Sequence, residues 1–196
     1  MIAWLNFISM VVSSLLCLLF YIKSAGPAAL EKKIGKKAYY KATQYRIIAS
    51  IFMTECALNY VIYYFYPLPL PIPKAFPWDW WVSASIAVLI SIPSGYLLMK
   101  GMRDAGEETI FVKREHQLYG GIYKKIRHPQ AVGELPFWWV IAFLLHSPFL
   151  VLYSFIWVPI FYLMCLVEEK DLEIRYGKEY IDYKRRTGFI IPKKSK

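Results

Sequence analysis

Two short clusters of ionisable residues in the second half of the chain are candidates for chemistry. The first is Arg127-His128, which directly precedes Pro129, and the second is the carboxylate pair Glu168-Glu169. Proline is favoured in the first turn of a helix, and the unpaired amides of that turn attract anions. A carboxylate such as Glu168 can hold an ammonium group through a charge-assisted hydrogen bond. The first cluster is also compatible with a simple basic anchor beside a membrane, so both interpretations stay open.

The motifs of several other kinds of site are missing from the sequence. No Gly-x-Gly-x-x-Gly, P-loop or Gly-x-Ser-x-Gly pattern occurs, which argues against a Rossmann cofactor site, a phosphate-binding loop and a serine hydrolase. The three histidines lack the spacing of zinc ligands, so we expect no metal. The three cysteines all lie in apolar segments and are predicted to be buried thiols rather than disulfides or metal ligands: Cys17, Cys56 and Cys165.

The composition is that of a protein embedded in a bilayer. Of the 196 residues, 57% are hydrophobic and only 19% are charged, whereas soluble domains have about 25% charged residues. The net charge of +10 comes from Lys and Arg at the ends of apolar segments. This arrangement favours contact with anionic lipid over binding to nucleic acid. We therefore predict a polytopic membrane protein and no nucleic-acid partner.

We predict an all-α fold with five transmembrane helices, because a span needs about 20 predominantly apolar residues. The last two spans are expected to form a helical hairpin that turns at Ser147-Pro148. The predicted spans are residues 1–22, 47–66, 80–99, 131–146 and 149–167.

Loop charges predict the orientation of these spans. Seven Lys or Arg lie in residues 23–46, seven in residues 100–127 and nine after residue 167, whereas residues 67–79 contain one. Basic loops remain in the cytoplasm, so the N-terminus is expected outside and the C-terminus inside. We treat residues 1–196 as one domain, with three spans in 1–100 and the catalytic half in 101–196.

Other polar features bear on the arrangement of the helices. A charge in mid-bilayer is costly, so Glu55 and Glu134 are predicted to face protein or a cavity rather than lipid. After the last span, the helix is expected to continue in the cytoplasm as an amphipathic segment. Its apolar stripe would pack on the membrane surface and consists of Leu172, Tyr176, Tyr180 and Tyr183.

Taken in order, the C-terminal clusters resemble the isoprenylcysteine carboxyl methyltransferase family, in a compact prokaryotic form. The first 100 residues match that family only as a hydropathy pattern. The residues that carry the resemblance are Gly121-x-Tyr123, Arg127-His128-Pro129, Gly133, Glu168-Glu169-x-x-Leu172, Tyr176-Gly177-x-Glu179-Tyr180-x-x-Tyr183 and Ile191-Pro192.

The resemblance implies transfer of a methyl group from S-adenosylmethionine to a carboxylate at the cytoplasmic membrane surface, leaving S-adenosylhomocysteine. At Ala131 the sequence departs from the family, which usually has tyrosine there. We assign Arg127 and Glu169 as catalytic, with Arg127 or His128 orienting the acceptor, and Glu134 and Trp138 as substrate-binding. The cofactor-binding positions implied are Glu115, His116, Gln117, Leu118, Tyr123, His128, Pro129, Gln130, Ala131 and Glu168.

The acceptor is expected to be an amphiphilic or prenylated carboxylate that enters between the spans. An α-carboxyl group has a pKa of about 3.3–3.7 and is ionised at neutral pH, so the protein mainly has to position the reactants. We expect a monomer in the cell membrane of a prokaryote, or in the endoplasmic reticulum if the source is eukaryotic.

Two other classes remain as alternatives. One is a related membrane enzyme, either a phospholipid N-methyltransferase or an NADPH-dependent sterol-type reductase. In the reductase, Lys124, Lys125 and Arg127 would bind the 2′-phosphate. The other is a non-enzymatic scaffold or carrier, for which the polar clusters would be anchors only.

Overall fold

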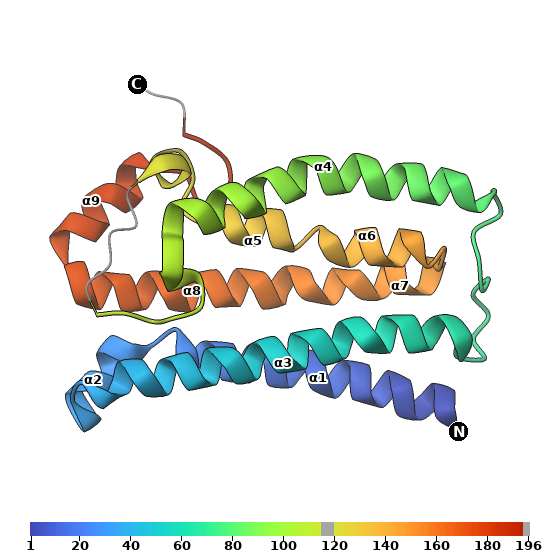
Figure 1. Ribbon diagram of the computed structural model, residues 1–196, viewed down its shortest axis with the longest axis horizontal. Coiled ribbons are helices and arrows are strands. Elements are labelled where there is room, and N and C mark those ends of the chain that lie inside the picture. The colour runs from blue at the N-terminus through green and yellow to red at the C-terminus, as the bar shows by residue number, and fades with distance from the viewer. Residues whose placement is uncertain (115–119, 194–196) are drawn as a thin grey trace.

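The computed structural model describes residues 1–114 and 120–193, in which helices are the regular elements and one isolated β-bridge occurs. Figure 1 shows long helices lying side by side, which confirms the all-α prediction. The long helices are α1 (Ile2–Ser24), α3 (Lys37–Phe65), α4 (Trp80–Ala105) and α8 (Trp157–Tyr176). The short elements are α2 (Pro27–Ile34), η1 (Gly106–Thr109), η2 (Gly121–Lys124), α5 (Pro129–Glu134), α6 (Phe137–Leu144), α7 (Pro148–Tyr153), η3 (Ser154–Ile156) and α9 (Lys178–Arg186).

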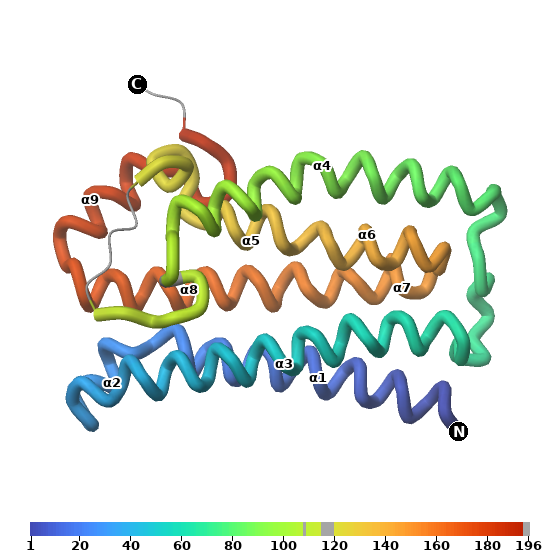
Figure 2. The backbone as a smooth tube through the Cα atoms, in the orientation of Figure 1, coloured from blue at the N-terminus to red at the C-terminus, as the bar shows by residue number. Residues whose placement is uncertain are grey.

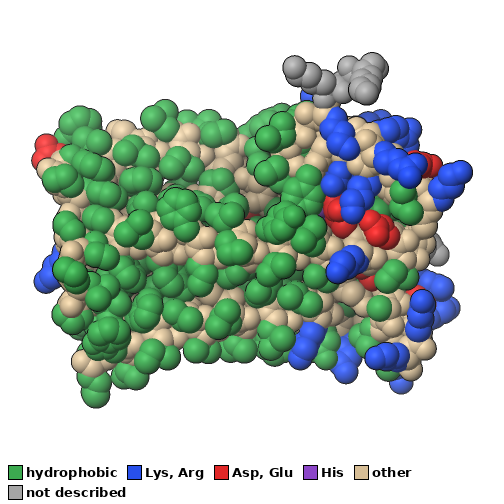
Figure 3. Space-filling model, turned by 180° about the vertical axis from the view of Figure 1, so that it is seen from behind, with side chains coloured by type: hydrophobic (Ala, Val, Ile, Leu, Met, Phe, Trp, Pro, Cys, Tyr) green, Lys and Arg blue, Asp and Glu red, His purple; other side chains and the backbone are tan. Residues whose placement is uncertain are grey.

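Four helical segments of the described chain are long and apolar enough to cross a bilayer. They are Ile2–Ser24, Lys37–Phe65, Trp80–Ala105 and Pro148–Tyr176, the last of which joins α7, η3 and α8. Each has at least 23 residues, which at a rise of about 1.5 Å per residue spans the roughly 30 Å hydrocarbon core. Figure 3 shows hydrophobic side chains along the length of the molecule and Lys and Arg gathered at one end. These features indicate an integral membrane protein.

The predicted span 131–146 is two short helices instead of one long helix. Helix α5 ends at Glu134 and α6 begins at Phe137, with Leu135-Pro136 between them. Proline has no backbone N–H to donate to the preceding turn, so the regular hydrogen-bonding pattern is interrupted there. The described residues therefore contain four helices with the properties of a span, where the sequence predicted five.

Helix α5 lies against α4 at a position where only glycine fits. A Cβ atom on Gly133 would lie 2.3 Å from the backbone nitrogen of Leu98 and 2.6 Å from the carbonyl oxygen of Ser94. Both neighbours are backbone atoms of α4, so they cannot yield as a flexible side chain would. This close approach fixes the position of the residues between Pro129 and Glu134 relative to α4.

Aromatic side chains hold the centre of the bundle together. Trp138 of α6 stacks on Trp157 of α8, with ring centroids 3.8 Å apart, and Tyr60 of α3 lies 5.2 Å from Trp138. The hydroxyl of Ser154 donates to the carbonyl oxygen of Trp138 at 3.1 Å. The core therefore joins the N-terminal hairpin to the C-terminal helices.

Polar side chains join α1 to α3 within the apolar segments. Asn6 donates to the carbonyl oxygen of Asn59, Asn59 donates to Ser9, and Ser9 donates to Glu55 at 3.1 Å. Glu55 is thus placed at a helix–helix contact, as expected for an acidic residue in a span. Cys17, Cys56 and Cys165 are free and buried, in agreement with the sequence interpretation.

The long helices extend beyond their apolar segments at the basic end of the bundle. Helix α3 begins at Lys37, well before residue 47, and α8 continues to Tyr176, well past residue 167. These extensions carry Arg46 and Glu168 on regular helix, so both side chains have fixed positions. Figure 2 shows that the chain after α4 turns sharply and runs across to α8 at this end.

The predicted continuous C-terminal helix is wrong at Gly177. This glycine has φ +53°, a left-handed conformation that ends α8, and α9 begins at the next residue. Tyr180 and Tyr183 of α9 are buried, and the Tyr183 hydroxyl donates to the carbonyl oxygen of Tyr123 at 2.7 Å. Tyr180 and Tyr183 therefore pack on the protein itself and not on a lipid surface.

Candidate active site

A partly enclosed cavity of about 150 Å³ lies at the basic end of the bundle. Its walls come from α1, α3, the segment after α4, residues 123–134 and α8. The predicted site residues that line it are Tyr123, Arg127, His128, Gln130, Ala131, Glu134 and Glu168. The fold therefore brings the two clusters of the C-terminal half together, although they are separated by about 40 residues in the sequence.

Glu168 presents its carboxylate to this cavity. The hydroxyl of Tyr21 donates to Glu168 at 2.6 Å, and His128 Nδ1 lies 3.7 Å from its other oxygen. A guanidinium nitrogen of Arg46 lies 3.8 Å away, beyond direct hydrogen-bond distance. The Glu168 side chain remains 30% exposed. This carboxylate is therefore fixed in place yet open to a ligand.

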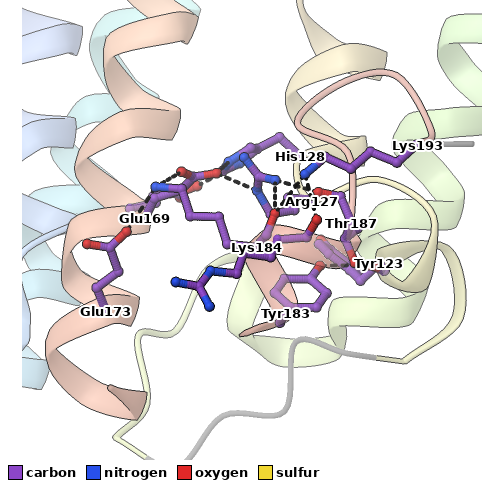
Figure 4. Close-up of polar contacts among 11 residues, drawn as sticks. Tyr123, Arg127, His128, Glu169, Glu173, Tyr183, Lys184, Thr187 and Lys193 are labelled. Atoms are coloured by element: carbon purple, nitrogen blue, oxygen red, sulfur yellow. Dashed lines mark hydrogen bonds and ion pairs between the residues drawn. The ribbon is translucent and has the colours of Figure 1, made fainter. Parts of the chain in front are cut away.

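Glu169, its neighbour in sequence, is only 2% exposed and faces a different set of groups. It accepts from Arg127 at 2.6 Å and from Lys184 at 2.7 Å, and His128 Nε2 lies 3.1 Å away (Figure 4). Glu169 does not line the cavity. A buried carboxylate surrounded by cations in this way holds the surrounding segments together, because losing one partner would leave a buried charge uncompensated.

Arg127 connects this cluster to the C-terminal segment. Besides Glu169, its guanidinium donates to the carbonyl oxygens of Lys184 and Thr187, at 3.0 and 2.5 Å (Figure 4). The backbone continues the contact: Arg127 N donates to Gly188 O at 2.9 Å and His128 N to Phe189 O at 3.3 Å. The guanidinium predicted to be catalytic is thus placed where it holds residues 187–189 against the site.

His128 lies between the two carboxylates and is almost completely buried. Burial alone would lower its pKa, but the facing Cys165 thiol and the carboxylates of Glu168 and Glu169 raise the pKa well above its usual value. These contacts favour the protonated form of His128, which lies between a carboxylate open to the cavity and a buried one.

Tyr123 and Gln130 form the side of the cavity nearest α4. The amide of Gln130 donates to the Tyr123 hydroxyl at 2.9 Å and lies 3.3 Å from the hydroxyl of Thr109. Burial raises the pKa of Tyr123, so its hydroxyl is neutral. Pro129 is buried against Gly101 and does not line the cavity.

The two predicted substrate-binding residues are placed differently. Glu134 lines the cavity beside Ala131, together with the apolar side chains of Phe161 and Met164. Trp138 is 4% exposed, belongs to the aromatic core and does not reach the cavity. The cofactor-binding predictions Glu115, His116, Gln117 and Leu118 lie outside the described residues.

Two residues of the N-terminal half belong to the site and were missed by the sequence interpretation. Tyr21 and Arg46 line the cavity, and both contact Glu168. Tyr21 is 147 positions from Glu168, so no local spacing could pair them. Arg46 was counted only among the basic residues of a loop. Its place at the start of an apolar helix is the signal that was available.

Comparison with known proteins decides the family. The model of the family described as phospholipid methyltransferase matches residues 82–179, which is half of the chain. The chain belongs to the phospholipid methyltransferase family. The matched range includes Tyr123, Arg127, His128 and Glu168, so the family match covers the C-terminal walls of the cavity.

A curated relative points in the same direction. Over 75 residues the chain is 39% identical to a Saccharomyces cerevisiae protein named protein-S-isoprenylcysteine O-methyltransferase. The match covers 37% of this chain and only 30% of the yeast protein's length. No solved structure matches the chain. The family, this relative and the apolar helices together support an integral membrane methyltransferase.

Proposed function

We propose that this phospholipid methyltransferase family member transfers a methyl group from S-adenosylmethionine to the carboxylate of an isoprenylcysteine-like lipid at the cytoplasmic membrane face. The products are a methyl ester and S-adenosylhomocysteine. The observation that carries the proposal is the Glu168 carboxylate, held by Tyr21 and His128 yet open to a cavity that both charged and apolar side chains line.

The residues around the cavity fit this cofactor chemically. Glu168 is a suitable partner for the ammonium group of the methionine moiety, through a charge-assisted hydrogen bond. Tyr21 and Tyr123 line the same cavity, and aromatic faces stabilise a sulfonium cation by about 0.5–2 kcal/mol. When bound, S-adenosylmethionine supplies an electrophilic methyl group on sulfur.

The chain's own task is to position the acceptor. A carboxylate acceptor is already ionised at neutral pH, so no residue has to remove a proton. Holding two reactants in the correct geometry lowers the barrier by up to roughly 7–11 kcal/mol. His128 and Glu169 contribute indirectly, because they fix the side chain of Arg127 and the segment 187–189 beside the cavity.

The lining of the cavity suits an acceptor with an apolar chain. Met53 of α3 and Phe161 and Met164 of α8 line its apolar part, and all three belong to the hydrophobic core or contact it. Glu134 lies within the same lining and is a candidate to accept a hydrogen bond from an N–H group of the acceptor, since two carboxylates would repel each other. The name of the yeast relative agrees with a prenylated acceptor.

We further propose that α5 and α6 together make a fifth crossing of the membrane. Figure 1 places them between α4 and α8, with the turn to α7 at the end of the bundle opposite α9. A fifth crossing puts the N-terminus outside and the basic end, with the cavity, in the cytoplasm. We expect a monomer in a prokaryotic cell membrane, or in the endoplasmic reticulum of a eukaryote.

Calorimetric titration of the detergent-purified protein with S-adenosylhomocysteine, beside NADPH, tests the cofactor. Micromolar binding of S-adenosylhomocysteine alone supports the proposal, whereas binding of NADPH alone would move the protein to the reductases. Transfer of tritiated methyl from S-adenosylmethionine to N-acetyl-S-farnesyl-L-cysteine then tests the acceptor. The expected product is base-labile, because it is a methyl ester.

A phospholipid N-methyltransferase is the second candidate. The observation that favours it is that Glu134 lines the cavity together with Glu168, because such a pair of carboxylates suits an ammonium headgroup. Vesicles of phosphatidylethanolamine as the acceptor distinguish the candidates. Base-stable methylation of this lipid, with none on the prenylcysteine, would replace the carboxyl methyltransferase with this alternative.

A further inference from the structure

A short apolar segment, residues 188–191, follows α9 at the basic end of the bundle. In Figure 1 the chain runs from α9 back toward α5 to form it. Phe189 packs on the protein, whereas the next two side chains do not. Ile190 and Ile191 are 49% and 73% exposed, so the described part of the protein leaves most of their apolar surface uncovered.

Phe189 shows how far this segment reaches along the bundle. Its ring lies 5.7 Å from the ring of Tyr162 of α8, centroid to centroid. Tyr162 belongs to a helical segment that is long and apolar enough to span a bilayer, and it is 53% exposed. It precedes Glu168, the first charged residue of α8, by six residues, or about 9 Å of helix. The segment therefore reaches past the charged end of α8 and lies beside its apolar part.

Basic groups lie directly beside the segment. The ammonium group of Lys193 donates to the carbonyl oxygens of Lys184 and Arg185, at 3.2 and 2.8 Å. The side chain of Arg185 is 76% exposed. Exposed apolar side chains next to exposed cations are typical of a segment that lies in the interface of a bilayer with anionic headgroups.

The same segment is joined to the wall of the cavity. The backbone N–H groups of Arg127 and His128 donate to the carbonyl oxygens of Gly188 and Phe189, at 2.9 and 3.3 Å. The ring of Phe189 lies 4.8 Å from the ring of His128 and 5.4 Å from the guanidinium carbon of Arg127. Because Arg127 and His128 both line the cavity, whatever fixes residues 188–191 also fixes part of that wall.

We propose that residues 188–191 are a membrane-contacting segment, with Ile190 and Ile191 inserted among the acyl chains of the leaflet at the basic end. The partner is phospholipid, whose phosphate groups lie beside the cations around Lys193. This contact holds the segment in place and thereby holds the backbone of Arg127 and His128 at the cavity. The bilayer is then part of what orders the site.

Spin labels on single introduced cysteines test the position of the segment in nanodiscs that contain phosphatidylglycerol. The label on Ile191→Cys should be accessible to oxygen and shielded from a water-soluble nickel chelate. Leu89→Cys, on the exposed face of α4, is the reference for lipid, and Glu179→Cys, exposed on α9, is the reference for water. The three native cysteines are buried, and labelling of wild type measures their background.

Amide hydrogen exchange in the same nanodiscs tests the effect on the cavity wall. In the double variant Ile190→Ser with Ile191→Ser, exchange of the Arg127 and His128 amides should rise about threefold or more, because local opening of a lightly packed segment sets this rate. Ile181→Ser is the matched control, since Ile181 is 40% exposed on α9 and lies outside the segment. It should leave the exchange of these two amides unchanged.

The other outcomes would overturn the inference. Nickel accessibility at position 191 equal to that at position 179 would place the segment in water. Shielding from both reagents, with dipolar broadening between labels, would mean that a second copy of the chain covers the isoleucines. Unchanged exchange in the double variant would show that lipid contact does not hold the cavity wall. Neither measurement requires methyl transfer, so this inference and the proposed function can fail separately.

Discussion

Replacing Glu168 with glutamine tests the cofactor site directly. The substitution removes one negative charge and keeps both the size of the side chain and an oxygen that can accept from the Tyr21 hydroxyl, now 2.6 Å away. A hydrogen bond to a charged group contributes about 1.5–3 kcal/mol, and each 1.4 kcal/mol is about tenfold in affinity. We therefore expect S-adenosylhomocysteine to bind Glu168→Gln roughly 10- to 150-fold more weakly than wild type.

The structure also indicates that the variant should remain folded. Glu168 is partly exposed, and the nearest cations lie 3.7 and 3.8 Å from its oxygens, so the ion pairs lost are loose. The neighbouring Glu169, which is buried and paired at 2.6 Å, is left intact. Thermal unfolding in detergent should show a small change in Tm beside the large loss of affinity measured by calorimetry.

Glu179→Gln is the control for this experiment, because Glu179 is an exposed carboxylate on α9 that does not line the cavity. It removes the same charge from the same end of the molecule and should leave the affinity unchanged. Equal affinity of wild type and Glu168→Gln for S-adenosylhomocysteine would refute the reasoning about Glu168. Equal weakening by both variants would mean that net charge, and not a specific contact, governs binding.

Three further predictions concern packing, surface charge and pH. Gly133→Val should lower Tm by several degrees in a thermal melt, since its Cβ would lie 2.3 Å from the Leu98 nitrogen; an unchanged Tm would contradict the close packing of α4 and α5. Lys32→Gln with Lys33→Gln should leave turnover unchanged, because both lysines are exposed on α2, and a large loss would extend the site to the first loop. Because the pKa of His128 is raised in the folded protein, its protonation stabilises the fold. This stabilisation is complete below the usual pKa of histidine, near 6.5, and is lost as the pH rises through the pKa of the folded state. The fall in Tm from pH 6.5 upward should therefore be smaller in His128→Gln; equal slopes would contradict a protonated His128.

The charged clusters of the site could be predicted because they stand out against an apolar sequence. Ionisable residues are costly near a bilayer, so Arg127-His128 and Glu168-Glu169 called for a reason other than lipid contact. The structure brings the clusters together, with His128 3.1 Å from Glu169. The helical class was equally accessible, since long apolar segments in a bilayer must satisfy their backbone hydrogen bonds internally.

The sequence analysis assigned Glu168 to the cofactor and Glu169 to catalysis, but it could not predict that Glu169 is buried among cations away from the cavity. Successive residues on an α-helix point about 100° apart, so two adjacent carboxylates face different surroundings. Which of them faces the cavity depends on how α8 is rotated against α1 and on where α9 returns. Neither the rotation of α8 nor the path of α9 can be deduced from a short stretch of sequence. At Gly177, where the structure has a break that redirects α9, the sequence predicted continuous helix.

The part of the site that comes from the N-terminal half of the chain could not be predicted, for a related reason. The hydropathy pattern of this half shows that α1 and α3 are apolar, but it does not show which of their faces meet α8. Arg46 enters the cavity because α3 begins before its apolar segment, and Tyr21 enters it from the last turn of α1 at the same end of the bundle. Substitutions of Tyr21 or Arg46 should therefore alter ligand binding, even though the family match lies elsewhere in the chain.

The two adjacent glutamates of α8 differ in role: Glu169 holds segments of the fold together, and Glu168 is available to a ligand. Glu169 is surrounded by Arg127, His128 and Lys184, so its charge is compensated without any ligand and holds α8, α5 and the C-terminal segment together. Glu168 shares only His128 with that cluster and faces the cavity. Because His128 touches both carboxylates, a ligand on Glu168 is bound against a backbone that Glu169 has already fixed, and little ordering remains to oppose binding.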